Sequence, residues 1–214
     1  MKIDIVSDTV CPWCFIGKRK LEEALAARPD LDVDITWHPF QLHPDMPEGG
    51  ADRKQFMAQK FGSLERAKEL YENVRNAGKA VDIPFEFGKI ERSPNTLDSH
   101  RLLRWADSAG CQDAMVEILF RRFFLDGEDI GDRAVLLAAA KEAGMDTDLV
   151  AELFEKDADR DLVSQEDIRA RQMGISGVPF FILNNKYALS GAQDAAAFLA
   201  AFDKIEADEA QAPE

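Results

Sequence analysis

The first forty residues alternate between the hydrophobic pattern of a strand and that of a helix. Apolar and polar residues alternate over 2–7, which predicts a strand because successive side chains point to opposite faces of a sheet. Apolar positions at helical spacing follow over 12–27, and Pro12 suits the first helical position, where no backbone N–H is needed. Alternation returns over 33–37. Two strands joined by a helix predict a parallel, right-handed β-α-β unit.

The middle of the chain has helical periodicity, after a loop over 38–50 that is rich in proline and glycine. The predicted helices cover 51–61, a segment capped by Ser63 that extends through Val74, 94–109, 112–125, 133–143 and 147–174. The last of these segments is long enough for one helix or for two in tandem.

The end of the chain returns to a strand pattern. The apolar run 178–183 and the segment 186–190 flank a short asparagine turn, which predicts a β-hairpin. A last helix is predicted over 195–205, and the acidic residues 206–214 are predicted to form a disordered tail.

Without the helical block, the remaining elements follow the order of the thioredoxin fold. We therefore predict an α/β protein with a four-stranded mixed core sheet of order 2-1-3-4, in which the hairpin runs antiparallel to the first pair of strands. The predicted division is an N-terminal β-α-β part over 1–45, a large inserted α-helical domain over 46–158, a C-terminal α-β-β-α part over 159–205 and the tail over 206–214.

Composition and charge narrow the classes of partner. The chain has 214 residues and a formal net charge of −14, which disfavours nucleic acid and anionic lipid as partners. It contains no apolar run near eighteen residues, so no membrane span is predicted. The N-terminus lacks a signal-peptide pattern, which favours a cytoplasmic protein, and we expect a monomer or a homodimer.

The candidate chemistry lies at the start of the first helix, in the motif Cys11-Pro12-Trp13-Cys14. A helix N-terminus favours a thiolate, and only a thiolate attacks a disulfide. Cys11 is therefore expected to be the exposed nucleophile, and Cys14, on the buried stripe of the helix, the resolving thiol. Two rival interpretations are a zinc site and an inert buried pair. Structural zinc needs four ligands, and the chain has one C-x-x-C pair, an isolated Cys111 and three histidines, so no metal site is predicted.

Five motifs, spread over nearly the whole chain, resemble those of the DsbA-like thioredoxin-fold family, and in particular its FrnE-type subfamily. They are Ser7–Gly17, Trp37–Pro44, Asn95–Leu102, Gly177–Phe181 and Ser190–Gln193. The resemblance implies a thioredoxin fold with an inserted helical domain. It also implies a cis peptide bond before Pro179, which would expose the backbone of Val178 beside Cys11 for an extended peptide or for glutathione.

Further side chains enter the predicted substrate or glutathione site. Pro12 is expected to influence the redox poise, and Trp13 to present an exposed ring that contacts substrates. The resemblance places Asn95 and His100 either in the cleft or in packing and capping roles. It places Gln193 where glutathione-using relatives hold the γ-glutamyl end of glutathione.

Three other side chains receive a structural interpretation. His38 and His43 are interpreted as structural loop residues, and Cys111 as a spare thiol.

The sequence thus predicts an enzyme, a thiol–disulfide oxidoreductase of DsbA/FrnE type. Its partners would be a disulfide- or thiol-containing protein or glutathione, with no bound cofactor and glutathione as a cosubstrate. One alternative is a glutathione-dependent isomerase or transferase of the 2-hydroxychromene-2-carboxylate isomerase and kappa class, whose members typically carry serine at the position of Cys11. The other is a peptide-binding or chaperone-like module.

Overall fold

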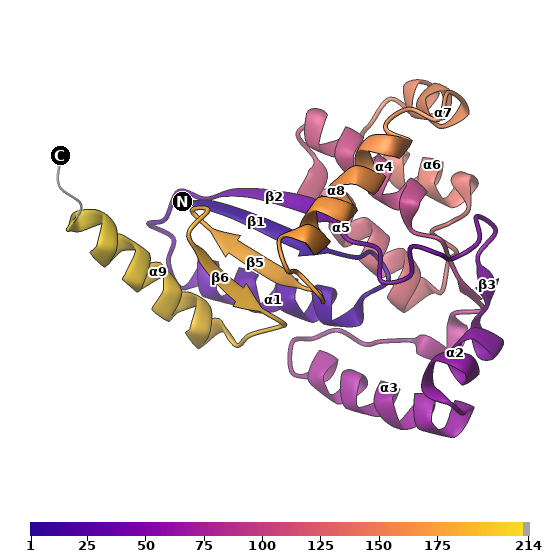
Figure 1. Ribbon diagram of the computed structural model, residues 1–214, viewed down its shortest axis with the longest axis horizontal. Helices are drawn as coiled ribbons and strands as arrows, with labels where there is room; N and C mark the ends of the chain where they lie inside the picture. Colours follow the sequence, from indigo (N-terminus) through magenta and orange to yellow (C-terminus); the bar gives the residue numbers. More distant parts are fainter. Residues whose placement is uncertain (212–214) are drawn as a thin grey trace.

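A four-stranded mixed sheet organises the computed structural model, which describes residues 1–211 (Figure 1). Its strands are β1 (Lys2–Ser7), β2 (Asp34–Pro39), β5 (Phe180–Leu183) and β6 (Tyr187–Ser190). The spatial order is β2-β1-β5-β6, in which β1 runs parallel to β2 and antiparallel to β5, and β5 and β6 form an antiparallel hairpin. The predicted order 2-1-3-4 is therefore confirmed.

Helices supply most of the remaining structure. They are α1 (Pro12–Ala26), α2 (Arg53–Phe61), α3 (Leu64–Lys79), α4 (Leu97–Ser108), α5 (Gln112–Arg121), α6 (Arg133–Glu142), α7 (Thr147–Glu155), α8 (Arg160–Gln172) and α9 (Ala195–Ala210). Shorter elements are the paired strands β3 (Ala51–Asp52) and β4 (Arg92–Ser93), the 3₁₀ turn η1 (Phe87–Lys89) and the π-helical turn η2 (Arg122–Asp126). The short strands were not predicted, because two residues are too few to show an alternating pattern.

The structure decides between one and two helices in one predicted segment and extends another predicted helix. The segment 147–174 forms two helices, α7 and α8, separated where Asp157 and Asp159 adopt left-handed backbone angles, with φ of 49° and 59°. Helix α9 continues to Ala210, so the prediction of a disordered tail is wrong for residues 206–210.

Two contacts to the β5–β6 hairpin hold the end of α9. Glu209 accepts a hydrogen bond of 2.8 Å from Asn184, and Asp208 accepts one from Tyr187. Residues 212–214 of the predicted tail lie outside the described residues.

The two faces of the sheet are covered by different helices. Ile3 and Ile5 of β1, with Phe181 of β5, belong to the core that also contains buried side chains of α1 and α9. The residue after Ile5, Val6, points to the other face and belongs to a smaller cluster under α8, to which Phe180 also contributes. The side-chain period of two in a strand thus directs alternate residues to the two helical layers that Figure 1 shows.

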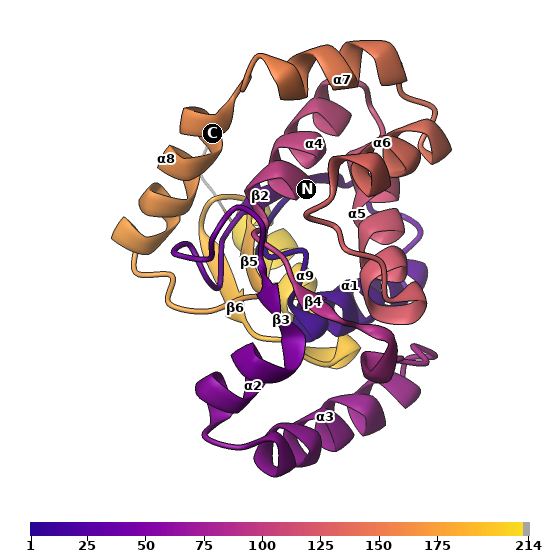
Figure 2. The ribbon, with the colours of Figure 1, turned by 90° about the vertical axis from the view of Figure 1, so that its right-hand side faces the viewer.

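The inserted helices share the core of the sheet. Phe15 of α1 stacks on Phe120 of α5, with ring centroids 5.0 Å apart, and both belong to one continuous buried cluster. Helices α2 and α3 extend away from the other inserted helices, at the opposite end of the molecule from α7 (Figure 2). The domain limits at 45, 158 and 205 remain predictions. Among residues 1–211, no helix is long and apolar enough to cross a membrane.

Helix α1 approaches β5 closely at Gly17. A Cβ atom at Gly17 would lie 3.0 Å from Cγ of Pro179 and 3.1 Å from Cζ of Phe181. We expect Gly17→Val to lower the free energy of unfolding by about 1–3 kcal/mol, because the added side chain forces α1 and β5 apart. Urea unfolding measures this change. The matched control is Gly88→Val, since a Cβ atom at Gly88 has no neighbour within 4 Å. Equal losses in the two variants would contradict the packing argument.

Candidate active site

The two motif cysteines occupy the first turn of α1. Cys11 is the N-cap residue and Pro12 the first helical residue, as the sequence predicts. The backbone N–H of Cys11 donates to the carbonyl of Asp8 at 3.0 Å, and the carbonyl of Cys11 accepts from the N–H of Cys14 at 3.0 Å. Cys11 therefore lies at the N-terminus of α1, which is the positive end of the helix dipole.

Cys14 is fully buried. Burial raises the pKa of the Cys14 thiol well above its ordinary value, and the neighbouring Cys11 raises it further. Hydrogen bonds from the Ser7 side chain and the Asp8 backbone oppose this shift. Cys14 is thus a protonated thiol at neutral pH in the reduced protein, and its burial agrees with the predicted position on the inner stripe of α1.

Cys11 is also buried, with an exposed fraction of 3%, so the expectation of an exposed residue is wrong. Helices α2 and α3 and the loop after β2 cover the head of α1 and leave a cavity of about 420 Å³ between them, which Cys11 lines. The Cys11 Sγ atom donates to the carbonyl oxygen of Val178 at 3.6 Å. A substrate would therefore reach Cys11 through this cavity, which we call the dithiol cavity.

The walls of the dithiol cavity are mainly apolar and come from five parts of the chain. They comprise Val10, Cys11, Pro12 and Trp13; Leu42, His43 and Met46; Arg53, Phe56, Met57, Lys60, Phe61, Leu70, Tyr71, Asn73 and Val74 of α2 and α3; Ser93 and Pro94; and Gly177 and Val178. Trp13 is 42% exposed, as expected for a ring beside the nucleophile. A volume of this size suits a small molecule or a short segment of chain.

The Val178–Pro179 peptide bond is cis, as the sequence resemblance implies. Val178 lines the dithiol cavity, whereas Pro179 packs against Gly17 behind it. Of the predicted substrate-binding residues, Pro12, Trp13 and Val178 therefore share the dithiol cavity with Cys11.

Besides Pro179, three predicted binding residues do not line the dithiol cavity. Asn95 donates to the carbonyl of Met46 at 2.5 Å and accepts from the N–H of Leu97 at 2.9 Å, beside a separate cavity of about 320 Å³. His100 is buried on α4. Gln193 is exposed and donates to the carbonyl of Ser190 at 2.7 Å. The hydrogen bond from Leu97, the first residue of α4, agrees with the helix-capping alternative for Asn95.

His100 pairs with the segment that precedes the dithiol. Its Nε2 atom lies 3.3 Å from Oδ1 of Asp8, and both side chains are buried. The other carboxylate oxygen of Asp8 accepts from the N–H of Leu42 at 2.7 Å. Asp8 therefore joins the loop after β2 to the segment that carries Cys11, and its other oxygen, Oδ1, lies beside His100 of α4 without forming a hydrogen bond.

His38 follows the sequence interpretation only in part. His38 lies in β2, not in a loop, and its Nε2 atom is 2.7 Å from Oδ1 of Asp4, which agrees with a structural role. Within residues 1–211, no three His, Cys, Asp or Glu side chains lie close enough together to hold a metal ion.

The sequence interpretation missed three side chains of the cavity wall. His43, interpreted as structural, lines the dithiol cavity and accepts a hydrogen bond of 2.9 Å from Lys60. Arg53 and Lys60 were not singled out. They could have been found, because Arg53, Phe56, Met57, Lys60 and Phe61 are spaced along one face of a helix. Two cations on an otherwise apolar face are an unusual pattern for a helix that only packs.

The fold and the dithiol define a class of protein, a thioredoxin-fold chain with a C-x-x-C motif at the head of its first helix and inserted helices over it. Comparison with known proteins agrees with this class. Residues 2–203 match the model of the DSBA-like thioredoxin domain, and the chain belongs to that family.

Similar proteins of known structure cover the whole chain. The probable DsbA oxidoreductase of Streptomyces coelicolor is 31% identical, with a TM-score of 0.89 over 100% of this chain and 92% of that one. A 2-hydroxychromene-2-carboxylate isomerase, at 12% identity and a TM-score of 0.73 over 100% of both chains, shares the fold. So does the cytosolic disulfide reductase DsbM of Pseudomonas aeruginosa, at 20% identity and a TM-score of 0.63 over 99% of this chain and 100% of that one.

A curated relative is similar over most of its length. The Bacillus subtilis (strain 168) protein YwbO is 26% identical over 189 residues, which are 86% of each chain.

Proposed function

We propose that this protein is a thiol–disulfide oxidoreductase of FrnE type that uses Cys11 as the nucleophile and Cys14 as the resolving thiol. The observation that carries the proposal is the different environment of the two sulfur atoms. Cys11 lines the dithiol cavity, whereas Cys14 is fully buried behind it with a raised pKa. This asymmetry gives the order of reaction, because a substrate in the cavity meets Cys11 first.

The reaction has two exchange steps. The Cys11 thiolate attacks one sulfur of a disulfide, forms a mixed disulfide and releases the other sulfur as a thiolate, which takes up a proton. Cys14 then loses its proton and attacks the Cys11 sulfur, which releases the second substrate thiol and leaves a Cys11–Cys14 disulfide. Overall the substrate disulfide gains two electrons and two protons, and the dithiol loses them. The reverse sequence oxidises a substrate.

Val178 contributes a positioning role in this proposal. Its carbonyl oxygen lies 3.6 Å from Cys11 Sγ, at the start of β5, so a substrate that reaches Cys11 passes this backbone. An extended peptide or glutathione can pair with such a free backbone edge. Glutathione is thereby a candidate cosubstrate. The neighbour DsbM has also been solved with GSH.

Equilibration in glutathione buffers of graded redox potential tests the function. We expect a reversible Cys11–Cys14 disulfide, found by mass spectrometry after thiol blocking, with a reduction potential between about −270 and −120 mV. A value near the lower limit indicates a reductase and one near the upper limit an oxidase. A dithiol that stays reduced throughout, or a disulfide that involves Cys111, would contradict the proposal. Glutathione-dependent isomerase activity that persists in Cys14→Ser would favour the alternative function.

A further inference from the structure

The dithiol cavity has a charge opposite to that of the whole protein. The chain carries 40 acidic and 26 basic residues, yet none of the described residues that line the cavity is Asp or Glu. Arg53 and Lys60 both line it, on the same side of α2. The wall beside Cys11 is therefore cationic in an acidic protein, and such a wall attracts an anion.

Neither cation is neutralised by the protein. Over residues 1–211, no carboxylate lies within ion-pair distance of Arg53 or Lys60, although most other arginines of this part of the chain form such pairs, for example Arg19, Arg28 and Arg122. Burial lowers the pKa of Lys60, and the charge of Arg53 lowers it further, whereas Cys11 and Asp8 act in the opposite direction. Burial likewise lowers the pKa of Arg53, opposed by Tyr71. The two positive charges repel each other, and an anion bound between them would relieve this repulsion.

Both side chains donate hydrogen bonds to neutral groups. The Arg53 guanidinium donates to Tyr71 Oη at 2.5 Å and to Ser93 Oγ at 3.2 Å, and it lies over the rings of Tyr71 and Phe123 at 5.6 and 5.8 Å. Lys60 Nζ donates to His43 Nε2 at 2.9 Å. Arg53 is therefore held in place before a ligand arrives, which reduces the entropy lost on binding, whereas Lys60 is exposed and has the single contact to His43.

We propose that the dithiol cavity binds low-molecular-weight disulfides that carry a carboxylate, with the acid group at Arg53 and Lys60 and the reacting sulfur at Cys11. This inference rests on the proposed function and specifies its substrate class. The apolar walls formed by Phe56, Met57 and their neighbours accept the carbon part of the molecule. The carboxylate takes no part in the exchange itself, in which the Cys11 thiolate forms the mixed disulfide and one substrate thiolate leaves.

Three disulfides of similar size and different charge test this inference. They are 3,3′-dithiodipropionate, which is anionic, bis(2-hydroxyethyl) disulfide, which is neutral, and cystamine, which is cationic. Each is mixed with reduced full-length protein, and the oxidation rate is measured by acid quench and mass spectrometry. The rates are divided by those of free dithiothreitol with the same disulfides, which removes intrinsic reactivity. We expect the wild type to favour the anion over the neutral disulfide by about tenfold or more, which corresponds to about 1.4 kcal/mol.

Variants separate binding from stability. Lys60→Met is expected to remove most of this preference, and Arg53→Met to act in the same direction. The readout is the ratio of the anionic to the neutral rate, in which a change in Cys11 reactivity common to all three disulfides cancels. Lys54→Met is the matched control, because Lys54 lies on the same helix but lines only the neighbouring cavity. It should keep the wild-type ratio. The preference should also shrink as salt rises, since ions screen exposed charges.

The outcomes distinguish the inference from the function it rests on. An unchanged anion-to-neutral ratio in Lys60→Met, or a wild type that prefers cystamine, would overturn the inference and leave the proposed function standing. An equal loss with all three disulfides in Lys60→Met would assign Lys60 a structural role and also overturn it. If no disulfide oxidises the wild-type dithiol, the proposed function fails and the inference fails with it.

Discussion

Replacement of Cys11 by serine is expected to lower the rate of thiol–disulfide exchange by on the order of 10³ or more, because a hydroxyl group cannot replace the attacking thiolate. Cys11 is the cysteine that lines the dithiol cavity, so no other thiol can take the first step from the same position. Reduction of bis(2-hydroxyethyl) disulfide by the protein in a glutathione-coupled assay measures the loss.

Replacement of Cys14 should have a different effect. In Cys14→Ser the first exchange proceeds at Cys11, but the buried resolving thiol is gone, so the mixed disulfide accumulates and is visible in the intact mass. Cys111→Ser is the matched control and should retain full activity, because Cys111 is not among the residues that line the dithiol cavity. Undiminished turnover in Cys11→Ser would sink the assignment of the nucleophile. If Cys14→Ser lost as much activity as Cys11→Ser and no mixed disulfide accumulated, Cys14 would not be the resolving thiol.

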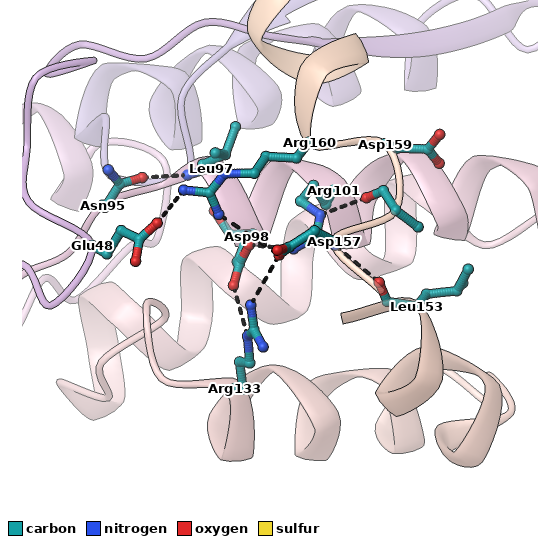
Figure 3. A network of polar contacts seen from close by, with 12 residues as sticks. Glu48, Asn95, Leu97, Asp98, Arg101, Arg133, Leu153, Asp157, Asp159 and Arg160 are labelled. Carbon is teal, nitrogen blue, oxygen red and sulfur yellow. Dashed lines mark hydrogen bonds and ion pairs between the residues drawn. The ribbon is translucent and has the colours of Figure 1, made fainter. Parts of the chain in front are cut away.

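Replacement of Arg101 by alanine is expected to cause the largest loss of stability, about 3–5 kcal/mol. Arg101 is fully buried on α4 and donates to the carbonyl oxygens of Ala158 at 2.7 Å and Leu153 at 2.9 Å. It also donates to Asp98 at 2.7 Å (Figure 3). One side chain therefore fixes the connection between α7 and α8 to α4. Alanine at this position leaves the carbonyl groups of Ala158 and Leu153 without their hydrogen-bond donor and creates a cavity in the core.

Arg133→Ala is the matched control. Arg133 binds the same Asp98, from α6, but its side chain is 46% exposed, so its loss should cost less than about 1 kcal/mol. Figure 3 shows the two arginines on either side of the Asp98 carboxylate. Urea unfolding of both variants gives the comparison. Because an unfolded Arg101→Ala would give no curve, Arg101→Lys supplies an intermediate, since one ammonium group cannot reach all three acceptors. If Arg101→Lys and Arg133→Ala lowered the free energy of unfolding by similar amounts, burial of the arginine would not determine its contribution to stability.

The sequence by itself determined the elements and their order. Local patterns were sufficient where one face of a segment is buried against the core, as for the alternating residues of β1 and the inner stripe of α1 with Cys14. The order of those elements then left few ways to arrange the sheet, and the observed strand order is the predicted one. The sequence motif also located the dithiol at the N-terminus of α1, because capping depends on residues that are neighbours in the chain.

Only the tertiary structure decided how the dithiol is enclosed. Arg53 and Lys60 lie more than forty residues along the chain from Cys11, and their place beside it depends on how α2 and α3 pack over the head of α1. That packing buries Cys11, which local pattern alone suggested would be exposed. The position of His100 on α4 places it beside Asp8 instead of in the cavity. Periodicity shows which face of a helix is apolar, but it does not show which distant surface covers that face. The sequence therefore supplied the reacting atoms, and the fold supplied the charged cavity through which a substrate reaches them.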